Sequence, residues 1–402
     1  MRSISHILLI TVPILLLLLS GFSFISLKQL LRQKRPLILK YGIPAIYWGY
    51  SLFILFYFIY LFIYPKSAAT STNYSTYFFF NTILITDLVV KLIMTLVLIP
   101  YYSLKLFKIN RLSLIWSGVV ICVGVVLTVI FGATSGVSRI RVEKVEIGCK
   151  GLPGAFDGLK IIQLSDIHLG SFNGNHYVLK KAIEKINALQ PDLILFTGDL
   201  VNNFSYELDG YKEVFKPLVA KLGKYSILGN HDYGDYFNWE EAGKKQDNFN
   251  KIEAAHGQFG FTLLENNAVP VINKGDTIFI VGVENWGHPP FPQYANLDKA
   301  LEHVPAGAFK ILLTHDPAHW ESKVAGERNI QLTLSGHTHG SQLGVDIAGV
   351  EFSPIYFTRK KWGGLYRHQS QYLYVNRGLG TIGLNFRIDM LPEVTEITLT
   401  KN

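Results

Sequence analysis

Long apolar runs fill the first third of the chain, whereas short apolar runs alternate with polar stretches in the remainder. A helix needs about 20 mainly apolar residues to cross the hydrocarbon core of a bilayer, because lipid offers no partners to unpaired backbone groups. The pattern predicts four membrane-spanning helices, at about residues 7–27, 43–64, 77–100 and 114–131. It divides the chain into an all-α transmembrane region, residues 1–137, and a second domain, residues 138–402.

Two of the four apolar segments have a second interpretation. The first resembles the apolar part of a signal peptide, but it has no clear small-x-small cleavage site, so we expect a retained anchor. The third contains Asp87 and Lys91, which lie four residues apart and therefore on one helical face. We expect these two charges to neutralise each other between packed helices, and the alternative is an ion or proton path.

The positive charges of the connecting loops predict the orientation, because loops rich in Lys and Arg stay in the cytoplasm. The first loop carries five basic residues: Lys28, Arg32, Lys34, Arg35 and Lys40. The third loop carries three: Lys105, Lys108 and Arg111. The second loop carries one, Lys66. Three basic residues after the fourth segment favour the opposite orientation: Arg139, Arg141 and Lys144. On balance we expect a multi-pass membrane protein with the second domain on the extracytoplasmic face.

The net charge of +8 does not indicate a nucleic-acid-binding protein. Residues 1–137 hold eleven Lys and Arg and one acidic residue, whereas residues 138–402 hold 27 basic and 29 acidic residues. The second domain is therefore slightly acidic and lacks the basic surface that nucleic acid requires. Cys122 and Cys149 are too few for a disulfide framework and have no metal-thiolate spacing.

In the second domain, short runs rich in Val, Ile and Leu alternate with longer polar stretches, which is typical of an α/β fold. Five of these runs lead directly into polar clusters: residues 160–165 into Asp166 and His168, 192–197 into Asp199, 225–228 into Asn230 and His231, 309–313 into His315, and 331–335 into His337 and His339. In open α/β sheets, ligands gather beyond the carboxyl ends of the strands. We therefore expect these five clusters to converge.

The clusters combine two carboxylates, one amide and five imidazoles. Mixed oxygen and imidazole ligands suit Mn, Fe or Zn, whereas an all-oxygen set would favour Mg or Ca. Asp199 is flanked by Gly198 and can therefore bridge two cations without steric hindrance from that neighbour. A single Asp-x-His or His-x-His is a weak signal, but five clusters at strand ends together indicate a two-metal centre.

With these motifs the sequence closely resembles the calcineurin-like metallophosphoesterase superfamily, and within it a membrane-associated bacterial branch. The resemblance covers roughly residues 140–400 and includes an Arg-Gly-Leu-Gly segment and a Pro-Glu strand near the C-terminus. It implies a four-layer α/β/β/α sandwich, in which two packed sheets are flanked by helices. It also implies hydrolysis by a hydroxide that two divalent metal ions activate, without a phosphoenzyme.

The resemblance further implies a role for each residue at the strand ends. The implied metal ligands are Asp166, His168 and His339 at one ion, Asn230, His315 and His337 at the other, and Asp199 as the bridge. The implied catalytic residue is His231, which would face the substrate phosphate and protonate the departing oxygen or hold the equatorial oxygens.

Two positions depart from the pattern of the family. Many members have an Asp three residues after the bridging one, where it orients the catalytic histidine, but this chain has Asn202. Asn202 can accept a hydrogen bond but supplies no charge, so His231 should be less basic unless Asp232 or another group compensates. Ser341 stands where a glycine commonly follows the His-x-His-Gly turn, and we expect it to affect loop geometry rather than ligation.

We expect a membrane-anchored, metal-dependent phosphoesterase whose substrate is a phosphorylated small molecule or a lipid-linked or envelope phosphate. Candidate phosphate contacts are Arg367, Arg377 and Arg387, although surface salt bridges explain them equally well. One alternative is an enzyme like the UDP-2,3-diacylglucosamine pyrophosphatases of lipid A synthesis, whose substrate is made on the cytoplasmic side. An alternative of another class is a membrane sensor or transporter with a non-catalytic phosphate-binding domain, against which the intact ligand set argues.

Overall fold

The computed structural model describes residues 6–31, 36–63, 74–109, 111–239, 241–288, 292–347 and 349–402. The chain divides into two compact units, Met1–Gly132 and Ala133–Asn402. Several residues that entered the prediction of spans and loops lie outside the described residues: Arg32, Lys34, Arg35, Tyr64 and Lys66.

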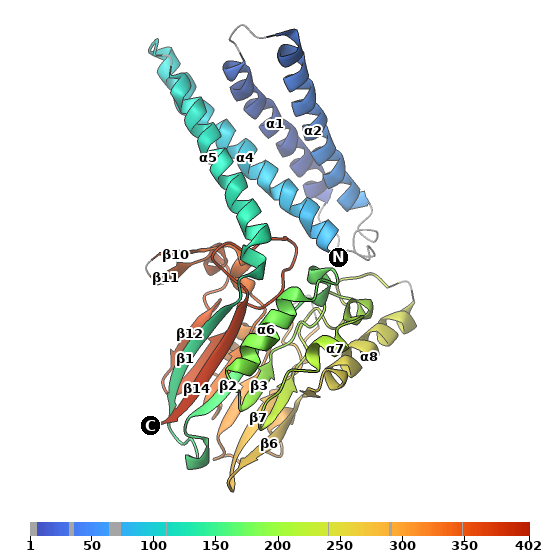
Figure 1. Ribbon diagram of the computed structural model, residues 1–402, viewed down its shortest axis with the longest axis vertical. Coiled ribbons are helices and arrows are strands. Elements are labelled where there is room, and N and C mark those ends of the chain that lie inside the picture. Colours follow the sequence, from blue (N-terminus) through green and yellow to red (C-terminus); the bar gives the residue numbers. More distant parts are fainter. Residues whose placement is uncertain are drawn as a thin grey trace. The chain divides into compact units, whose positions relative to one another are not determined.

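Among the described residues of the N-terminal unit are four long apolar helices, as the hydrophobic pattern predicts; their ribbons are labelled in Figure 1. They are α1 (His6–Leu30), α2 (Leu37–Ile63), α4 (Tyr74–Leu106) and α5 (Leu112–Thr134). They correspond to four stretches long and apolar enough to cross a membrane: Ile10–Leu30, Leu37–Leu61, Thr76–Leu106 and Leu112–Ser138. Large apolar side chains such as Val120 and Ile99 remain 69% and 64% exposed, which suits lipid rather than water as the surroundings.

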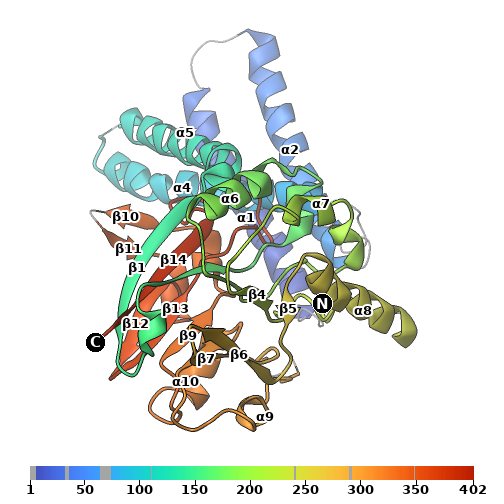
Figure 2. The same cartoon turned by 60° about the horizontal axis from the view of Figure 1, so that its bottom comes forward.

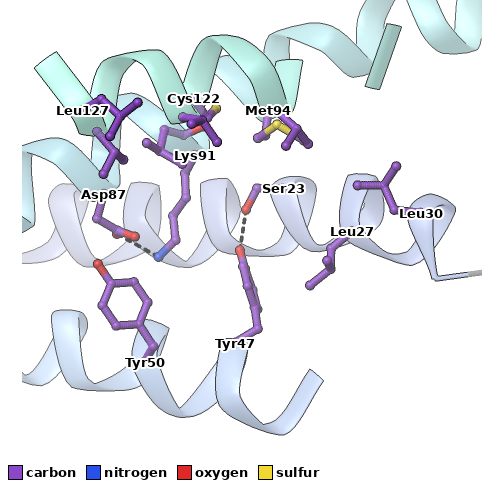
Figure 3. A pocket seen from close by; sticks show the side chains of 14 residues that line it. Ser23, Leu27, Leu30, Tyr47, Tyr50, Asp87, Lys91, Met94, Cys122 and Leu127 are labelled. Atoms are coloured by element: carbon purple, nitrogen blue, oxygen red, sulfur yellow. Dashed lines mark hydrogen bonds and ion pairs between the residues drawn. The ribbon is translucent and has the colours of Figure 1, made fainter. Parts of the chain in front are cut away.

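Side chains from all four helices line a largely apolar cavity of about 410 Å³ in this unit (Figure 3). Asp87 and Lys91 meet at its wall, where the Lys91 Nζ lies 2.8 Å from the Asp87 carboxylate and both side chains are 4% exposed. The same ammonium lies 5.9 and 5.7 Å from the ring centres of Tyr47 and Tyr50, within the range of a cation–π interaction. The two opposite charges therefore neutralise each other inside the unit.

The C-terminal unit contains two six-stranded sheets (Figure 2). The first sheet has the order β1-β14-β2-β3-β4-β5, formed by Arg141–Cys149, Glu393–Lys401, Leu159–Leu164, Leu193–Phe196, Gly223–Ser226 and Thr262–Leu263. The second has the order β12-β13-β9-β8-β7-β6, formed by Gly364–His368, Gln371–Val375, Leu332–Ser335, Lys310–Leu313, Asp276–Gly282 and Asn267–Asn273. Strands β2 to β5 are mutually parallel, and so are β7, β8, β9 and β13.

Alternating side chains of the strands supply three hydrophobic layers, because successive residues of a strand point to opposite faces. In β3, Leu193 and Leu195 enter the core between the sheets, whereas Ile194 and Phe196 face the helices. The outer face of the first sheet is covered by α6 (Tyr177–Ala188), α7 (Lys212–Phe215) and α8 (Ala242–Gln258). The outer face of the second is covered by α9 (Leu297–Leu301) and α10 (Pro317–Lys323). This is the four-layer α/β/β/α arrangement that the resemblance implies.

One ionisable residue is buried within the helical layer on the first sheet. His256 of α8 is 1% exposed, its ring stacks 5.9 Å from that of Phe196, and its Nδ1 lies 2.9 Å from the Ser226 hydroxyl. Burial lowers the pKa of His256 to about 3. As the pH falls below about 6.5, the unfolded chain takes up a proton at this position before the folded chain does, so stability is lost.

We therefore predict that His256→Gln, which retains a partner for Ser226 but cannot titrate, loses less thermal stability than the wild type between about pH 7 and pH 5. Thermal denaturation of the full chain in detergent measures the difference. Substitution of an exposed histidine, His303→Gln, provides the control and should leave the pH dependence unchanged. Equal losses in wild type and His256→Gln would contradict the assignment.

Candidate functional site

The five polar clusters lie together at the carboxyl ends of strands from both sheets. Asp166 and His168 follow β2, Asp199 follows β3, and Asn230 follows β4 by a short turn. The remaining clusters follow the second sheet, with His315 after β8 and with His337 and His339 after β9. Because β2, β3 and β4 are parallel to one another, and β8 is parallel to β9, the polar clusters of each sheet lie at one edge, and they converge in space as the sequence predicts.

The first of two groups of potential ligand atoms, here called the first metal group, consists of Asp166, His168 and His339. The His339 Nε2 lies 3.2 Å from the Asp166 Oδ1 and 3.1 Å from the His168 Nε2. All three residues are at most 4% exposed. Three donor atoms from two sheets therefore face one point.

The second metal group consists of Asp199, His315 and His337. The His315 Nε2 lies 3.2 Å from both the Asp199 Oδ2 and the His337 Nδ1. The Oδ1 of Asn230 joins them, at 2.9 Å from the His315 Nε2 and 2.8 Å from the His337 Nδ1. Its amide nitrogen donates to the Tyr236 hydroxyl at 2.7 Å, which turns the amide oxygen toward the group.

The carboxylate of Asp199 lies between the two groups. Its Oδ2 is 3.6 Å from the His168 Nε2 of the first group and 3.2 Å from the His315 Nε2 of the second. Its Oδ1 accepts a hydrogen bond of 2.8 Å from the His231 backbone N–H. One carboxylate thus serves both groups.

The hydrogen bonds of two histidines decide which ring nitrogen is free. The His168 Nδ1 lies 3.1 Å from the Val201 carbonyl, and the His315 Nδ1 lies 2.8 Å from the Thr197 carbonyl. A carbonyl accepts only, so each Nδ1 carries a hydrogen, and the Nε2 that each ring directs inward holds a lone pair whenever that ring is neutral. Lone pairs that face one another without hydrogens between them are what a divalent cation requires. The residues present therefore fit two such ions.

The charges of the buried carboxylates also favour bound cations at this site. Asp166 and Asp199 are both almost fully buried, and burial opposes their charge, but the imidazoles of His339 and His315 hold the pKa of each carboxyl below its ordinary value. Although burial disfavours a charged imidazole, the Asp199 carboxylate raises the pKa of His315 to about 10. Two buried negative charges thus require nearby positive charge, which bound cations supply as well as a proton does.

The backbone at the site adopts a conformation that most residues avoid. Five site residues have left-handed φ values: Asp166 (49°), His168 (47°), Asp199 (60°), His337 (74°) and His339 (52°). Each such residue costs on the order of 1–3 kcal/mol and persists only where the surrounding structure imposes it. Ser341 shares this conformation with φ 58°, which agrees with an effect on the shape of the loop.

Two glycines allow the close approach of the turns. A Cβ on Gly229 would lie 2.2 Å from the Asp199 Oδ1, and one on Gly336 would lie 2.2 Å from the Asp166 Oδ2. Such distances are impossible without moving the carboxylates. Glycine is therefore required at both positions for the carboxylates to stay where they are.

His231 is oriented differently from the sequence-based expectation. Its Nδ1 lies 2.7 Å from the main-chain carbonyl of Asn202, whereas the Asn202 side-chain amide is directed toward the Glu207 carboxylate and the His168 carbonyl. The hydrogen bond that His231 was expected to donate to the Asn202 side chain is therefore donated to the Asn202 backbone carbonyl instead. The Tyr236 ring stacks on His231 with centroids 4.3 Å apart.

Asp232 does not compensate for the missing charge by contacting His231. Its buried carboxylate accepts hydrogen bonds from the backbone N–H groups of Gly229, Asp199, Leu200 and Val201 at 2.9–3.2 Å. It joins the turns after β3 and β4. Consistent with the absence of a charged partner, burial lowers the pKa of His231, with the charge of Asp199 acting in the opposite direction.

The three candidate phosphate contacts have separate surroundings. Arg387 is fully buried and donates to the carbonyls of Gly380, Met390 and Arg377, with its Nη2 3.2 Å from the His339 Nδ1. Arg377 is 5% exposed and forms an ion pair of 2.6 Å with Glu393. Arg367 is exposed, and its Nε donates to the Gln369 carbonyl. The structure thus does not bring these three side chains together.

Sequence reasoning missed two residues beside the site. Glu207 accepts backbone hydrogen bonds of 2.6–3.0 Å from Gly170, Asn202, Asn203 and Phe204, and so joins the segments after β2 and β3. The spacing of Glu207 three residues after the start of a turn is a capping signal that was available. Arg359 gave no signal, because its run of basic residues lies far from any motif.

Arg359 lies directly beside the second metal group. Its Nη1 donates to the Asp316 Oδ1 at 3.1 Å, and its Nη2 lies 3.2 Å from the His337 Nε2. Its side chain is 27% exposed, whereas that of Asp316 is 3% exposed. A buried carboxylate therefore holds a partly exposed guanidinium next to a potential metal ligand.

Comparison with known proteins identifies the family. The calcineurin-like phosphoesterase family matches residues 159–341. The metallophosphoesterase YkuE of Bacillus subtilis is 33% identical over 256 residues, which cover 62% of this chain and 81% of YkuE. A transmembrane protein with metallophosphoesterase domain from Danio rerio is 29% identical over 280 residues, 67% of this chain and 60% of that protein. The UDP-2,3-diacylglucosamine pyrophosphatase LpxG of Chlamydia trachomatis is 29% identical over 273 residues, 56% of this chain and 78% of LpxG.

The chain therefore belongs to the calcineurin-like metallophosphoesterase family and is a phosphoester hydrolase. This confirms the resemblance and the α/β sandwich expected from it. The family uses divalent metal ions, and the two metal groups are the corresponding candidates in this chain.

Proposed function

We propose that this chain is a membrane-anchored, dinuclear phosphoesterase that hydrolyses a phosphoester or pyrophosphate bond. The observation that carries the proposal is the position of Asp199, whose Oδ2 lies within 3.6 Å of a ring nitrogen from each metal group. With Asp199 shared between two cations, Asp166, His168 and His339 would hold one ion, and Asn230, His315 and His337 would hold the other.

Two bound divalent ions, Mn, Fe or Zn by their donor set, would polarise the phosphoryl oxygens and lower the pKa of a water molecule. The chain's own contribution is orientation. The Asn202 carbonyl and the Tyr236 ring fix His231, and the Nδ1 bond leaves Nε2 as the nitrogen that faces substrate. His231 would protonate the departing oxygen or hold an oxygen of the phosphoryl group.

We also assign substrate contact to Arg359. The guanidinium has five N–H donors, and its contacts with Asp316 and His337 use only part of them. The remaining donors suit oxygens of a phosphoryl group next to His337. Arg367, Arg377 and Arg387 are less suited, because they lie elsewhere or are bonded to other protein groups.

The substrate class follows from the anchor and the relatives. Four helices apolar enough to span a bilayer would hold the enzyme at the membrane, where lipid-linked or other envelope phosphates are at hand. LpxG, one of the relatives, is a UDP-2,3-diacylglucosamine pyrophosphatase. We propose a lipid-linked phosphate or pyrophosphate as substrate and keep the extracytoplasmic orientation from the loop charges.

We predict that the full chain, loaded with Mn, hydrolyses an aryl phosphodiester and that Asp199→Ala abolishes this activity together with part of the bound metal. His231→Ala should retain its metal but lose roughly 10²–10⁴-fold in kcat, the contribution of a positioned acid. Elemental analysis and steady-state kinetics measure the two effects. Activity that survives Asp199→Ala would exclude the two-metal assignment, and metal binding without turnover in the wild type would favour a binding-only domain.

We further predict that Arg359→Lys raises KM by about tenfold, since one charge-assisted hydrogen bond is lost. Inhibition by inorganic phosphate should weaken in parallel, whereas kcat should change less. Arg328→Lys is a matched control, because Arg328 is also paired with a carboxylate, Asp298 at 2.7 Å, but on an exposed surface. Unchanged KM and phosphate inhibition in Arg359→Lys would contradict substrate contact.

The orientation predicts the behaviour of a reporter fused after Asn402. Alkaline phosphatase at this position should be active and green fluorescent protein should be dark, because the first folds only outside the cytoplasm and the second fluoresces only inside it. The reverse pattern would place the site in the cytoplasm and strengthen the case for a substrate like that of LpxG.

A further inference from the structure

A two-stranded hairpin stands apart from both sheets of the C-terminal unit (Figure 1). It consists of β10 (Val345–Ile347) and β11 (Val350–Phe352), in which Val345 pairs with Phe352 and Ile347 with Val350. Directly paired residues point to the same face, and so do every second residue's side chains. Four apolar side chains therefore share one face of the hairpin, and they are 44%, 70%, 72% and 43% exposed for Val345, Ile347, Val350 and Phe352.

The opposite face of the hairpin is acidic and binds the rest of the unit. Asp346 and Glu351 form a cross-strand pair, and the Arg141 Nη1 lies 3.6 and 3.3 Å from their carboxylates. The buried Arg377 forms a second ion pair with Glu351. The acidic face of the hairpin is thus bonded to the rest of the unit, with the Asp346 and Glu351 side chains 30% and 21% exposed. The apolar face is the more exposed of the two, which is the reverse of the usual arrangement at a water-exposed surface.

The segment after the hairpin extends the exposed apolar face. The rings of Phe352 and Phe357 lie 5.9 Å apart, and Phe357 is 76% exposed. Tyr356 is 43% exposed, and the Lys360 ammonium lies over its ring at 3.8 Å from the centre. We call the six apolar residues the hairpin patch: Val345, Ile347, Val350, Phe352, Tyr356 and Phe357.

We propose that the hairpin patch is a membrane-contact surface that inserts among the headgroups of an anionic bilayer. Exposed aliphatic side chains with tyrosine and phenylalanine beside them are typical of surfaces that lie at the membrane interface. The exposed Lys360 at the edge of the patch, followed in sequence by Lys361, supplies the positive charge that attracts anionic lipid. A bilayer would lie close to this patch, because the same chain carries four helices apolar enough to cross one.

The segment that joins the two parts of the hairpin patch is hydrogen-bonded to the loop that carries His339. The Ser353 hydroxyl, which follows β11, donates to the carbonyls of Gly340 at 2.7 Å and Leu343 at 2.8 Å. His339 immediately precedes Gly340, and Arg359 follows the patch to reach His337. Contact of the patch with a bilayer therefore brings the metal groups near the level of the headgroups. This position of the metal groups favours the headgroup phosphates of lipids as substrates, an inference that rests on the proposed function.

An environment-sensitive fluorophore attached to Val350→Cys in the full-length protein tests the contact. The native cysteines, Cys122 and Cys149, are buried, so the new thiol is labelled selectively. In nanodiscs of phosphatidylcholine and phosphatidylglycerol, the emission should shift to the blue and brominated lipid should quench most of it. The matched control is Ile272→Cys on β6, where the native side chain is 66% exposed, and its label should stay water-like and unquenched.

Three outcomes would overturn the proposal. The first is that the labels at positions 350 and 272 behave alike, which excludes a specific contact with lipid. The second is a blue-shifted label at position 350 that brominated lipid does not quench. In that case the patch is covered by protein, either a second copy of the chain or the chain's own helices. The lysine variants Lys360→Glu and Lys361→Glu should reduce the quenching in anionic nanodiscs but not in nanodiscs of phosphatidylcholine alone. The third overturning outcome is that these variants leave the quenching in anionic nanodiscs unchanged. Since none of these readouts depends on hydrolysis, failure of the proposed function would leave them intact.

Discussion

Two buried carboxylates, at the ends of β2 and β3, impose the requirement that the rest of the catalytic unit meets. Asp166 is 0% and Asp199 is 1% exposed, and an isolated ionised carboxyl in such surroundings is very unfavourable. Each is stabilised by backbone N–H groups and by imidazoles, of which His315 and His339 come from the opposite sheet. Neither sheet alone can hold these charges, so the site exists only where the two meet.

This dependence explains where the molecule tolerates strain. Left-handed backbone at Asp166, His168, Asp199, His337 and His339 is unfavourable, and it is offset by the packed core between the sheets and by carboxylates such as Asp232 and Glu207 that accept several N–H groups. Donor atoms 3–4 Å apart leave no room for adjustment. Rigid strand ends, rather than flexible loops, are therefore the means by which the site is held together.

Charged side chains have a second role in the same unit. Arg377 and Arg141 hold the acidic face of the β10–β11 hairpin, and Arg377 is also paired with Glu393 of strand β14. The ion pairs thus fix a hairpin whose apolar face remains 43–72% exposed. An enzyme with both an apolar helical unit and such a surface would be held to lipid at two places in its sequence.

The sequence by itself determined the helical unit, the strands and the candidate ligands, because all three are local signals. Apolar length marks α1, α2, α4 and α5, alternation and β-branched residues mark the strands, and each polar cluster directly follows a strand that the pattern reveals. Family motifs added the two-sheet fold and the proposed division of the candidate ligands between two ions. The tertiary structure alone decided which atoms meet.

The orientation of His231 by the Asn202 carbonyl rather than its side chain depends on how two turns pack, and no local pattern records it. Arg359 reaches His337 from a loop 22 residues away, and the Arg387 guanidinium is consumed by backbone carbonyls that sequence cannot assign. The outward face of the hairpin was equally hidden, since its alternation of apolar and acidic residues reads as an ordinary strand. Arg141 and Arg377 decide which face of the hairpin is turned toward the rest of the unit, because both are paired with Glu351. These two arginines are far apart in the sequence, and only the folded chain brings them together.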